Sequence, residues 1–150
     1  MILKSYSFRE GGDIPRTFTC DGTNMSPSLA IEDVPKEVQS LALIMDDPDA
    51  TRGISFTHWL VWNIPPKTTE FGEGEAPRGA VEGRNDFGSE GYGGPCPPRG
   101  AKPHRYMFKL YALDKILDIA KNSGKNGLER AMEGHILEQA TLMGMYSRVI

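Results

Sequence analysis

The fold is set by GYGGPCPPRGAKPHRYMFKLY, residues 91–111, in which a loop rich in glycine and proline runs into a strand. Glycine permits backbone angles that other residues avoid, and proline restricts its own, so the first half cannot form ordinary secondary structure. The second half, residues 105–111, alternates with the period of two that is typical of a β-strand. We expect a stiff loop that leads into this strand and holds the side chains of His104 and Arg105 in place.

Other segments predict further strands and a mainly β fold. Residues 40–45 (SLALIM) form a continuous apolar run that suits a strand buried on both faces. Residues 57–64 are aromatic and β-branched and end at two prolines, and residues 18–21 also have strand character. Because many short strands are separated by turn clusters, the pattern favours a β-sandwich over alternating βαβ units.

One helix is predicted in the last third of the chain. Asn126 is a suitable N-cap, and the apolar residues that follow have the i, i+3, i+4, i+8 spacing of one helix face: Leu128, Ala131, Met132 and Ile136. Gly134 weakens the pattern, so we expect the helix to end near it and residues 136–146 to form a closing strand.

Length and composition are those of a single domain spanning residues 1–150. The hydrophobic share of 39% and the charged share of 25% match a soluble globular protein. A net charge of −3 gives no electrostatic reason to bind nucleic acid or an anionic membrane. No apolar run approaches the roughly 20 residues that cross a bilayer, and the N-terminus lacks a signal-peptide core, so we expect no membrane insertion and a cytoplasmic location.

The two cysteines, Cys20 and Cys96, lie outside any CxxC pair, and the three histidines are scattered, so we expect no metal site. In a cytosolic chain two reduced thiols are favoured. A disulfide between them is the alternative, because both lie in loops rich in glycine or proline and because intracellular disulfides occur in hyperthermophiles.

Polar side chains cluster next to the predicted strands. Two carboxylates, Asp47 and Asp49, follow the apolar strand 40–45, and His58 lies early in the strand 57–64. On a strict period of two His58 shares a face with Leu60 and Trp62, and His104 shares a face with Tyr106. Such a set can bind a phosphate or carboxylate, hold a metal, or form an acid–base pair. The segment 83–88 fits either a turn or part of the pocket rim, and the turn is favoured because Asn and Asp hydrogen-bond their own backbone in turns.

Two stretches, in this order, closely resemble the phosphatidylethanolamine-binding protein family, also called the Raf kinase inhibitor protein family: DDPDATRGISFTHWLVWNIP and GYGGPCPPRGAKPHRYMFKLYAL. FTCDGTNMSPSL near the start and EGHILEQATLMGMYSR at the end extend the resemblance to nearly the whole chain, and the compact bacterial and archaeal branch is the most similar. The resemblance implies a mainly β sandwich of two antiparallel sheets with Greek-key character and one or two peripheral helices. It also implies homodimers, which are common among prokaryotic relatives.

The resemblance further implies one small pocket at the sheet ends that accepts anions such as phosphate, phosphorylethanolamine or acetate. Matched position by position, the ligand-binding residues are Asp47, Asp49, His58, Cys96, Pro98, His104 and Tyr106. Cys96 stands where animal relatives have glycine, so only its backbone N–H is expected to donate to the anion.

The residue types predict how such an anion is held. Asp47 and His58 can form a carboxylate–imidazole pair that raises the fraction of imidazolium. His104 and the Tyr106 hydroxyl supply further donors. Arg105, on the opposite strand face, is predicted to pair with an acidic residue, for which Asp86 and Glu90 are the candidates.

We therefore expect a binding protein with a regulatory role that needs no cofactor and has no catalytic residues. Relatives of the family are reported to inhibit serine proteases or kinases, so the alternative is an inhibitor of serine proteases or another enzyme through exposed loops. The long segment 65–103 is the loop that could enter a protease cleft, and the protein target, a protease or a kinase, is unidentified. A hydrolase is less favoured, because no activated serine or cysteine nucleophile is evident.

Overall fold

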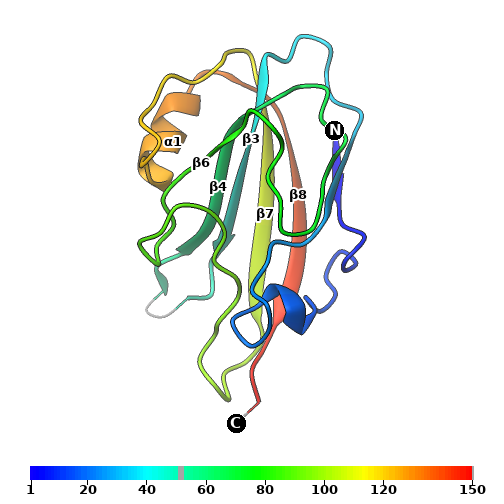
Figure 1. Cartoon of the computed structure of the whole chain (residues 1–150), viewed down its shortest axis with the longest axis vertical. Coiled ribbons are helices and arrows are strands. Elements are labelled where there is room, and N and C mark those ends of the chain that lie inside the picture. The colour runs from blue at the N-terminus through cyan, green and yellow to red at the C-terminus, as the bar shows by residue number, and fades with distance from the viewer. Residues whose placement is uncertain (51–52, 150) are drawn as a thin grey trace.

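The computed structural model describes residues 1–50 and 53–149, and their strands form two antiparallel sheets (Figure 1). The larger sheet has the order β6-β4-β3-β7-β8, with the bounds β6 Val81–Glu82, β4 Phe56–Ile64, β3 Ser40–Asp47, β7 His104–Leu113 and β8 Ile136–Tyr146. The smaller sheet has the order β1-β2-β5, with the bounds β1 Ile2–Lys4, β2 Leu29–Glu32 and β5 Glu70–Phe71. A short 3₁₀ helix, η1 (Arg16–Phe18), and one α-helix, α1 (Lys125–Met132), lie at the periphery. The predicted mainly β sandwich is confirmed.

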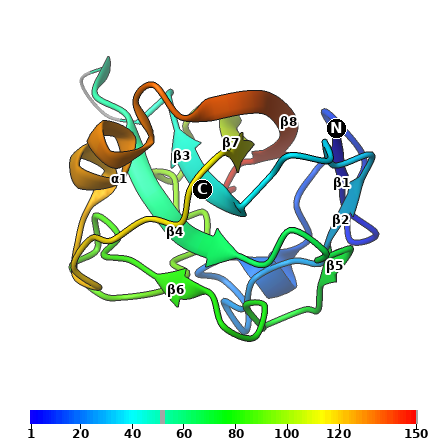
Figure 2. The same ribbon diagram turned by 90° about the horizontal axis from the view of Figure 1, so that it is seen from above.

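The central strands β3 and β4 are buried on both faces, because the smaller sheet covers one face of the larger sheet and α1 the other (Figure 2). Alternate side chains of β3 enter the core between the two sheets: Leu41, Leu43 and Met45. The intervening side chains, Ala42 and Ile44, lie in a second cluster with Leu128 and Met132 of α1. A strand covered on both faces needs apolar side chains at every position, which explains the continuous run of β3.

The strand predictions hold except at the N-terminal end. β4 and β7 each begin one residue earlier than predicted, and β3 continues through Asp47. The predicted strand character of residues 18–21 is wrong, since η1 and a turn occupy this region. The N–H groups of Phe18 and Thr19 donate to the carbonyls of Pro15 and Arg16, which closes tight local turns instead of a ladder.

The last third of the chain contains the predicted helix and closing strand. α1 is capped by Gly124 and not by Asn126, so the predicted N-cap is wrong. Gly134, with a φ of 81°, lies in the left-handed region that favours glycine and separates α1 from β8. No helix formed by the described residues is long and apolar enough to cross a membrane.

Candidate anion-binding site

A cavity of about 470 Å³ lies where β3 ends and β4 and β7 begin, at the lower end of the larger sheet in Figure 1. These ends meet because β3 lies between β4 and β7 and runs antiparallel to both. Six of the seven predicted site residues line the cavity: Asp47, His58, Cys96, Pro98, His104 and Tyr106. The seventh, Asp49, is not part of the lining.

A direct hydrogen bond in the cavity joins Asp47 and His104. The Nδ1–H of His104 donates to Oδ2 of Asp47 at 2.7 Å, and both side chains are largely buried. The other carboxylate oxygen of Asp47 accepts the backbone N–H of Asp49 at 2.8 Å. Since both oxygens are engaged, Asp47 orients the imidazole and leaves Nε2 as the ring nitrogen available to the cavity.

The predicted pair of Asp47 with His58 is wrong. Asp47 lies opposite Phe56 in the ladder between β3 and β4, two residues away from His58. Its carboxylate instead meets the histidine at the start of β7. A sequence pattern assigns each residue to a strand, but the choice between two neighbouring strands depends on their relative register.

His58 occupies a β-bulge. Met45 pairs with Trp59, yet Asp46 pairs with Thr57, so His58 is the extra residue on β4. Strict alternation would place its ring with Leu60 on the face covered by α1, and that prediction is wrong. The bulge turns the imidazole toward β7, where its ring centre lies 5.3 Å from that of Tyr106.

The imidazole of His58 is held in one tautomer by the loop above it. Nδ1 lies 2.6 Å from the carbonyl oxygen of Gly93, and because a carbonyl only accepts, Nδ1 carries the proton. Burial lowers the pKa of His58, although the Gly93 carbonyl and the Asp47 carboxylate act in the opposite direction. Burial therefore disfavours the imidazolium of His58 in the free protein, in the opposite direction to the predicted effect of Asp47.

Tyr106 lies between the two imidazoles. Its ring packs edge-on against His58 and is stacked with His104 at a centroid distance of 6.4 Å. Burial raises the pKa of Tyr106, so the hydroxyl keeps its proton at neutral pH and can donate a hydrogen bond. The prediction that His104 and Tyr106 share a face is confirmed, because both line the cavity from β7.

Asp49 and Arg105 form a separate ion pair beside the cavity. Nε and Nη2 of Arg105 donate to the two carboxylate oxygens of Asp49 at 2.9 and 2.8 Å, and the backbone N–H of Arg105 adds a third bond at 2.9 Å. The hydrogen bonds from Arg105 lower the pKa of Asp49 to about 2. The predicted structural role of Arg105 is thus supported, but its acidic partner is Asp49 and not Asp86 or Glu90.

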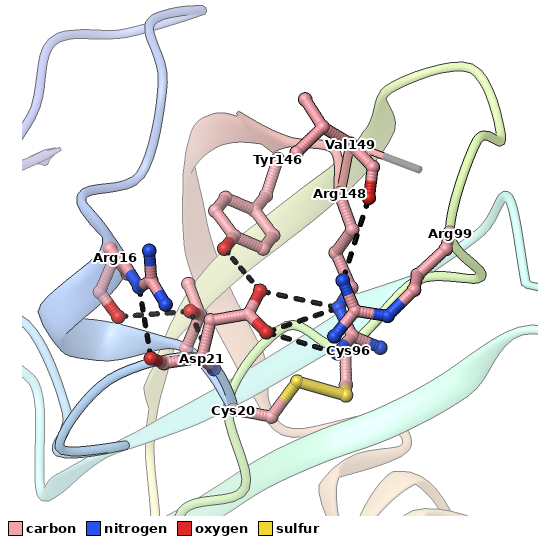
Figure 3. A network of polar contacts seen from close by, with 9 residues as sticks. Arg16, Cys20, Asp21, Cys96, Arg99, Tyr146, Arg148 and Val149 are labelled. Atoms are coloured by element: carbon pink, nitrogen blue, oxygen red, sulfur yellow. Dashed lines mark hydrogen bonds and ion pairs between the residues drawn. A yellow bond between two sulfur atoms is a disulfide. The ribbon is translucent and has the colours of Figure 1, made fainter.

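The wall of the cavity is cross-linked, because Cys20 and Cys96 form a disulfide with their Cα atoms 5.4 Å apart (Figure 3). The favoured prediction of two reduced thiols is wrong. Main-chain contacts bring the two loops together, since the N–H of Cys20 donates to the carbonyl of Pro95 at 3.1 Å and that of Gly94 to Oδ1 of Asn24 at 2.9 Å. Disulfides persist in oxidising compartments and in hyperthermophiles, so the cytoplasmic location stays a prediction.

The loop after β6 is both a turn and a part of the cavity lining. Asn85 accepts the N–H of Phe87 at 3.0 Å and donates to the carbonyl of Gly91, which confirms the favoured turn in 83–88. Asp86 and Phe87 also line the cavity, as the alternative interpretation of this segment as pocket rim expects. Phe87 meets Phe56 at a ring-centre distance of 4.7 Å. No local pattern indicates this contact, because it depends on the loop returning to β4.

The cavity thus brings two oriented imidazoles and a phenol together with two carboxylates, of Asp47 and Asp86. Among residues 1–50 and 53–149, no three histidine, cysteine, aspartate or glutamate side chains converge in a way that could hold a metal ion. The arrangement can donate hydrogen bonds to an anion and can accept them from a cation next to it.

Comparisons with known proteins agree with the sequence motifs. The model of the family described as phosphatidylethanolamine-binding protein matches residues 4–147. A protein of Methanothermobacter thermautotrophicus named "UPF0098 protein" is 50% identical over 153 residues, which cover 99% of each chain.

Two solved structures share the whole fold. CT736 of Chlamydia trachomatis, a homolog of phosphatidylethanolamine-binding protein, is 41% identical with a TM-score of 0.92 and covers 98% of this chain and 97% of its own. YbcL of Escherichia coli, described as a member of the mammalian PEBP family, is 34% identical with a TM-score of 0.91, covering 97% and 96%. Because the family model spans nearly all of its length, this chain belongs to the phosphatidylethanolamine-binding protein family.

Proposed function

We propose that the cavity binds a small ligand with a phosphate or carboxylate group. The observation that carries this proposal is the pair of Asp47 and His104. With Nδ1–H committed to the carboxylate, the ring is held in one orientation and Nε2 is left for the ligand. Nε2 can donate to an anionic oxygen when both ring nitrogens carry a proton, and such charge-assisted hydrogen bonds are about twice as strong as neutral ones.

Two further donors support the anion site. The Tyr106 hydroxyl stays protonated because burial raises its pKa. Cys96 lines the cavity, and its backbone N–H makes none of the hydrogen bonds formed between described residues. A main-chain N–H that points into a concave site is a common ligand for phosphate oxygens.

Phosphorylethanolamine fits the charges of the cavity better than a bare phosphate does. Asp86 lines the cavity, and only Oδ2 of its carboxylate is engaged by a hydrogen bond with another described residue, the N–H of Thr57 at 2.7 Å. An ammonium group next to the bound phosphate can pair with this carboxylate. The volume of about 470 Å³ also lies in the range of roughly 300–1,000 Å³ that is typical of small-molecule sites.

We propose binding and not hydrolysis as the role of the site. The sulfur of Cys96 is held in the disulfide and is not free to attack. Ser55 also lines the cavity, but its hydroxyl is 3.3 Å from Nζ of Lys125 and not engaged with an imidazole. Neither residue therefore has the nucleophile–base contact on which covalent catalysis depends.

The inhibitor alternative has no specific structural observation in its favour. The segment 65–103 on which it depends contains β5 and β6 and is joined to the body by main-chain hydrogen bonds. Examples are the N–H groups of Gly83 and Gly93, which donate to the carbonyls of Leu60 and His58. A regulatory role, a protease or kinase target and a homodimer stay predictions from the family resemblance.

Isothermal titration with inorganic phosphate and with phosphorylethanolamine tests the proposal. His104→Ala is expected to weaken both ligands by about tenfold or more, as for the loss of a charged hydrogen bond. Asp86→Asn is expected to weaken phosphorylethanolamine only. His135→Ala is the matched control, because His135 forms the same kind of pair with Asp114 on the surface, at 2.8 Å.

If His58→Ala and His104→Ala both leave the affinities unchanged, the cavity is not the binding site. If Asp86→Asn weakens both ligands equally, the carboxylate does not recognise the ammonium group.

A further inference from the structure

We propose that the Cys20–Cys96 disulfide is a site of thiol–disulfide exchange with a dithiol reductant, and that its closed form is the one that binds the anion. The inference rests on the proposed function of the cavity. Its starting point is that Cys96 belongs to the cavity lining while both cysteines are exposed to solvent. A solution thiol can therefore reach a bond that is part of the binding site.

The disulfide is the side-chain cross-link of the cavity wall, defined here as residues 96–98. The residues before the wall, 93–95, are buried, and after it the N–H of Gly100 donates to the carbonyl of Arg148 at 2.9 Å. Within the wall, Pro97 and Pro98 have no N–H, and the hydrogen bonds between described residues include none from the amide of Cys96. Opening the disulfide therefore removes a side-chain cross-link from the wall. The packing of the buried Pro97 and the hydrogen bond from the N–H of Ala101 to the carbonyl of Pro98 at 3.2 Å stay in place.

The other end of the cross-link is firmly anchored. Next to Cys20, the carboxylate of Asp21 accepts a hydrogen bond from the Tyr146 hydroxyl at 2.5 Å and from Nη2 of Arg148 at 3.0 Å (Figure 3). Nε of Arg16 also donates to the carbonyl of Asp21 at 2.9 Å. Reduction should accordingly free the wall and leave the segment around Cys20 in place.

The surroundings of the disulfide favour exchange. Near the disulfide, Arg16 and Arg148 both donate to Asp21, the residue after Cys20, and Arg99 lies beside Arg148 (Figure 3). Positive charge stabilises a thiolate, and a thiolate is the leaving group when a disulfide is attacked. Exposed disulfides are also the ones that are commonly labile or regulatory.

The exchange transfers two electrons from the dithiol to the disulfide through a mixed disulfide. A thiolate of the dithiol attacks one sulfur, the bond between Cys20 and Cys96 breaks, and the other cysteine leaves as a thiolate. The second thiol of the reductant then attacks the mixed disulfide. The reductant ends as a disulfide, and the two cysteines end as thiols after proton uptake.

Coupling between two equilibria is reciprocal. If closing the disulfide raises the affinity for phosphate by some factor, saturating phosphate must shift the reduction equilibrium toward the disulfide by the same factor. A wall that only lies near the ligand, without affecting its binding, would show neither effect.

The experiment compares the oxidised protein with the protein reduced by dithiothreitol, using phosphate titration and thiol alkylation followed by mass spectrometry. We expect native protein to gain two alkylated thiols, and its phosphate affinity to fall at least about fivefold, the low end of typical couplings. Cys20→Ala, which leaves the lining intact, should bind as weakly as reduced wild type and should not respond to reductant. Tyr146→Phe, which removes a neighbouring contact but not the disulfide, should keep the response.

A disulfide that dithiothreitol does not reduce in the folded protein overturns the inference, and so does equal phosphate affinity of the two forms. Circular dichroism of the reduced protein separates local opening from unfolding, and a globally unfolded reduced form also overturns the inference. If the oxidised protein binds no phosphate at all, the proposed function fails. Hydrogen exchange of the amides of Gly100 and Ala101, which donate to Arg148 and Pro98, then tests the cross-link by itself, because unchanged exchange on reduction would contradict a freed wall.

Discussion

The Nδ1–H of His104 donates to the carboxylate of Asp47 at 2.7 Å, and this bond joins the end of β3 to the start of β7 at the base of the cavity. The second histidine of the cavity, His58, donates its Nδ1–H to the main-chain carbonyl of Gly93 instead. The two imidazoles therefore have the same tautomer but different electrostatic partners. Only the ring of His104 has a carboxylate in direct contact, so the two rings should contribute differently to anion binding.

Asp47→Asn should weaken phosphate binding by roughly tenfold to a hundredfold. Asparagine keeps the shape of the side chain but removes the charge that orients and supports the imidazole, a contact worth about 1.5–3 kcal/mol when one partner is charged. Isothermal titration measures the effect. Asp114→Asn, in the exposed pair with His135, is the matched control and should leave the affinity unchanged.

Arg105→Ala should lower the free energy of unfolding only slightly at pH 7, because Arg105 is half exposed and its pair with Asp49 is screened by solvent. The pKa of Asp49 is lowered to about 2 in the folded protein, against about 3.9 in an unfolded chain. The stability that the pair provides is therefore complete above about pH 4 and is lost as the pH falls through about 2.

Urea denaturation at pH 7, 4 and 2.5 measures this dependence. The difference between wild type and Arg105→Ala should shrink toward the lowest pH, and Lys102→Ala, which removes an exposed charge in the same region, should show no such trend. A difference that stays constant with pH would mean that Arg105 stabilises the fold through packing and not through Asp49.

His58 should titrate below the ordinary value of about 6.5 in the free protein, because burial lowers its pKa. The unfolded chain binds this proton first, so the contribution of His58 to stability falls as the pH drops below about 6.5. Saturating phosphate should raise the pKa of His58, since a nearby negative charge favours the imidazolium. Nuclear magnetic resonance of the imidazole nitrogens reports both effects, and a pKa that phosphate leaves unchanged would place the anion away from His58.

Gly94→Ala should destabilise the protein by more than about 2 kcal/mol, as for overpacking in a rigid site. A Cβ at this position would lie 2.3 Å from the main-chain oxygen of Phe18, where the loop before β7 crosses the segment after η1. Gly127→Ala in α1 is the matched control, because its Cβ would meet only ordinary contacts at 3.4 Å and alanine favours a helix. Thermal denaturation measures the melting temperatures of both variants. Equal melting temperatures for Gly94→Ala and wild type would contradict the predicted destabilisation.

The sequence by itself determined the elements that depend on local periodicity. The continuous apolar run of β3 indicated a strand covered on both faces, and the alternation in β7 placed His104 and Tyr106 on one face. Gly134 correctly indicated where α1 gives way to β8. These features follow from a few consecutive residues, because side-chain direction repeats every two residues in a strand and every 3.6 in a helix.

Only the tertiary structure decided which side chains meet. The bulge that turns His58 toward Tyr106 arises from the register between two strands, and one extra residue reverses the face that a strict alternation assigns. The partner of Asp47 depended in the same way on which neighbouring strand lay closer to its carboxylate. The disulfide joins cysteines 76 residues apart, and their approach depends on contacts between two loops that no local pattern encodes. Local chemistry therefore identified the residues of the site, and long-range register and loop packing decided how they are paired.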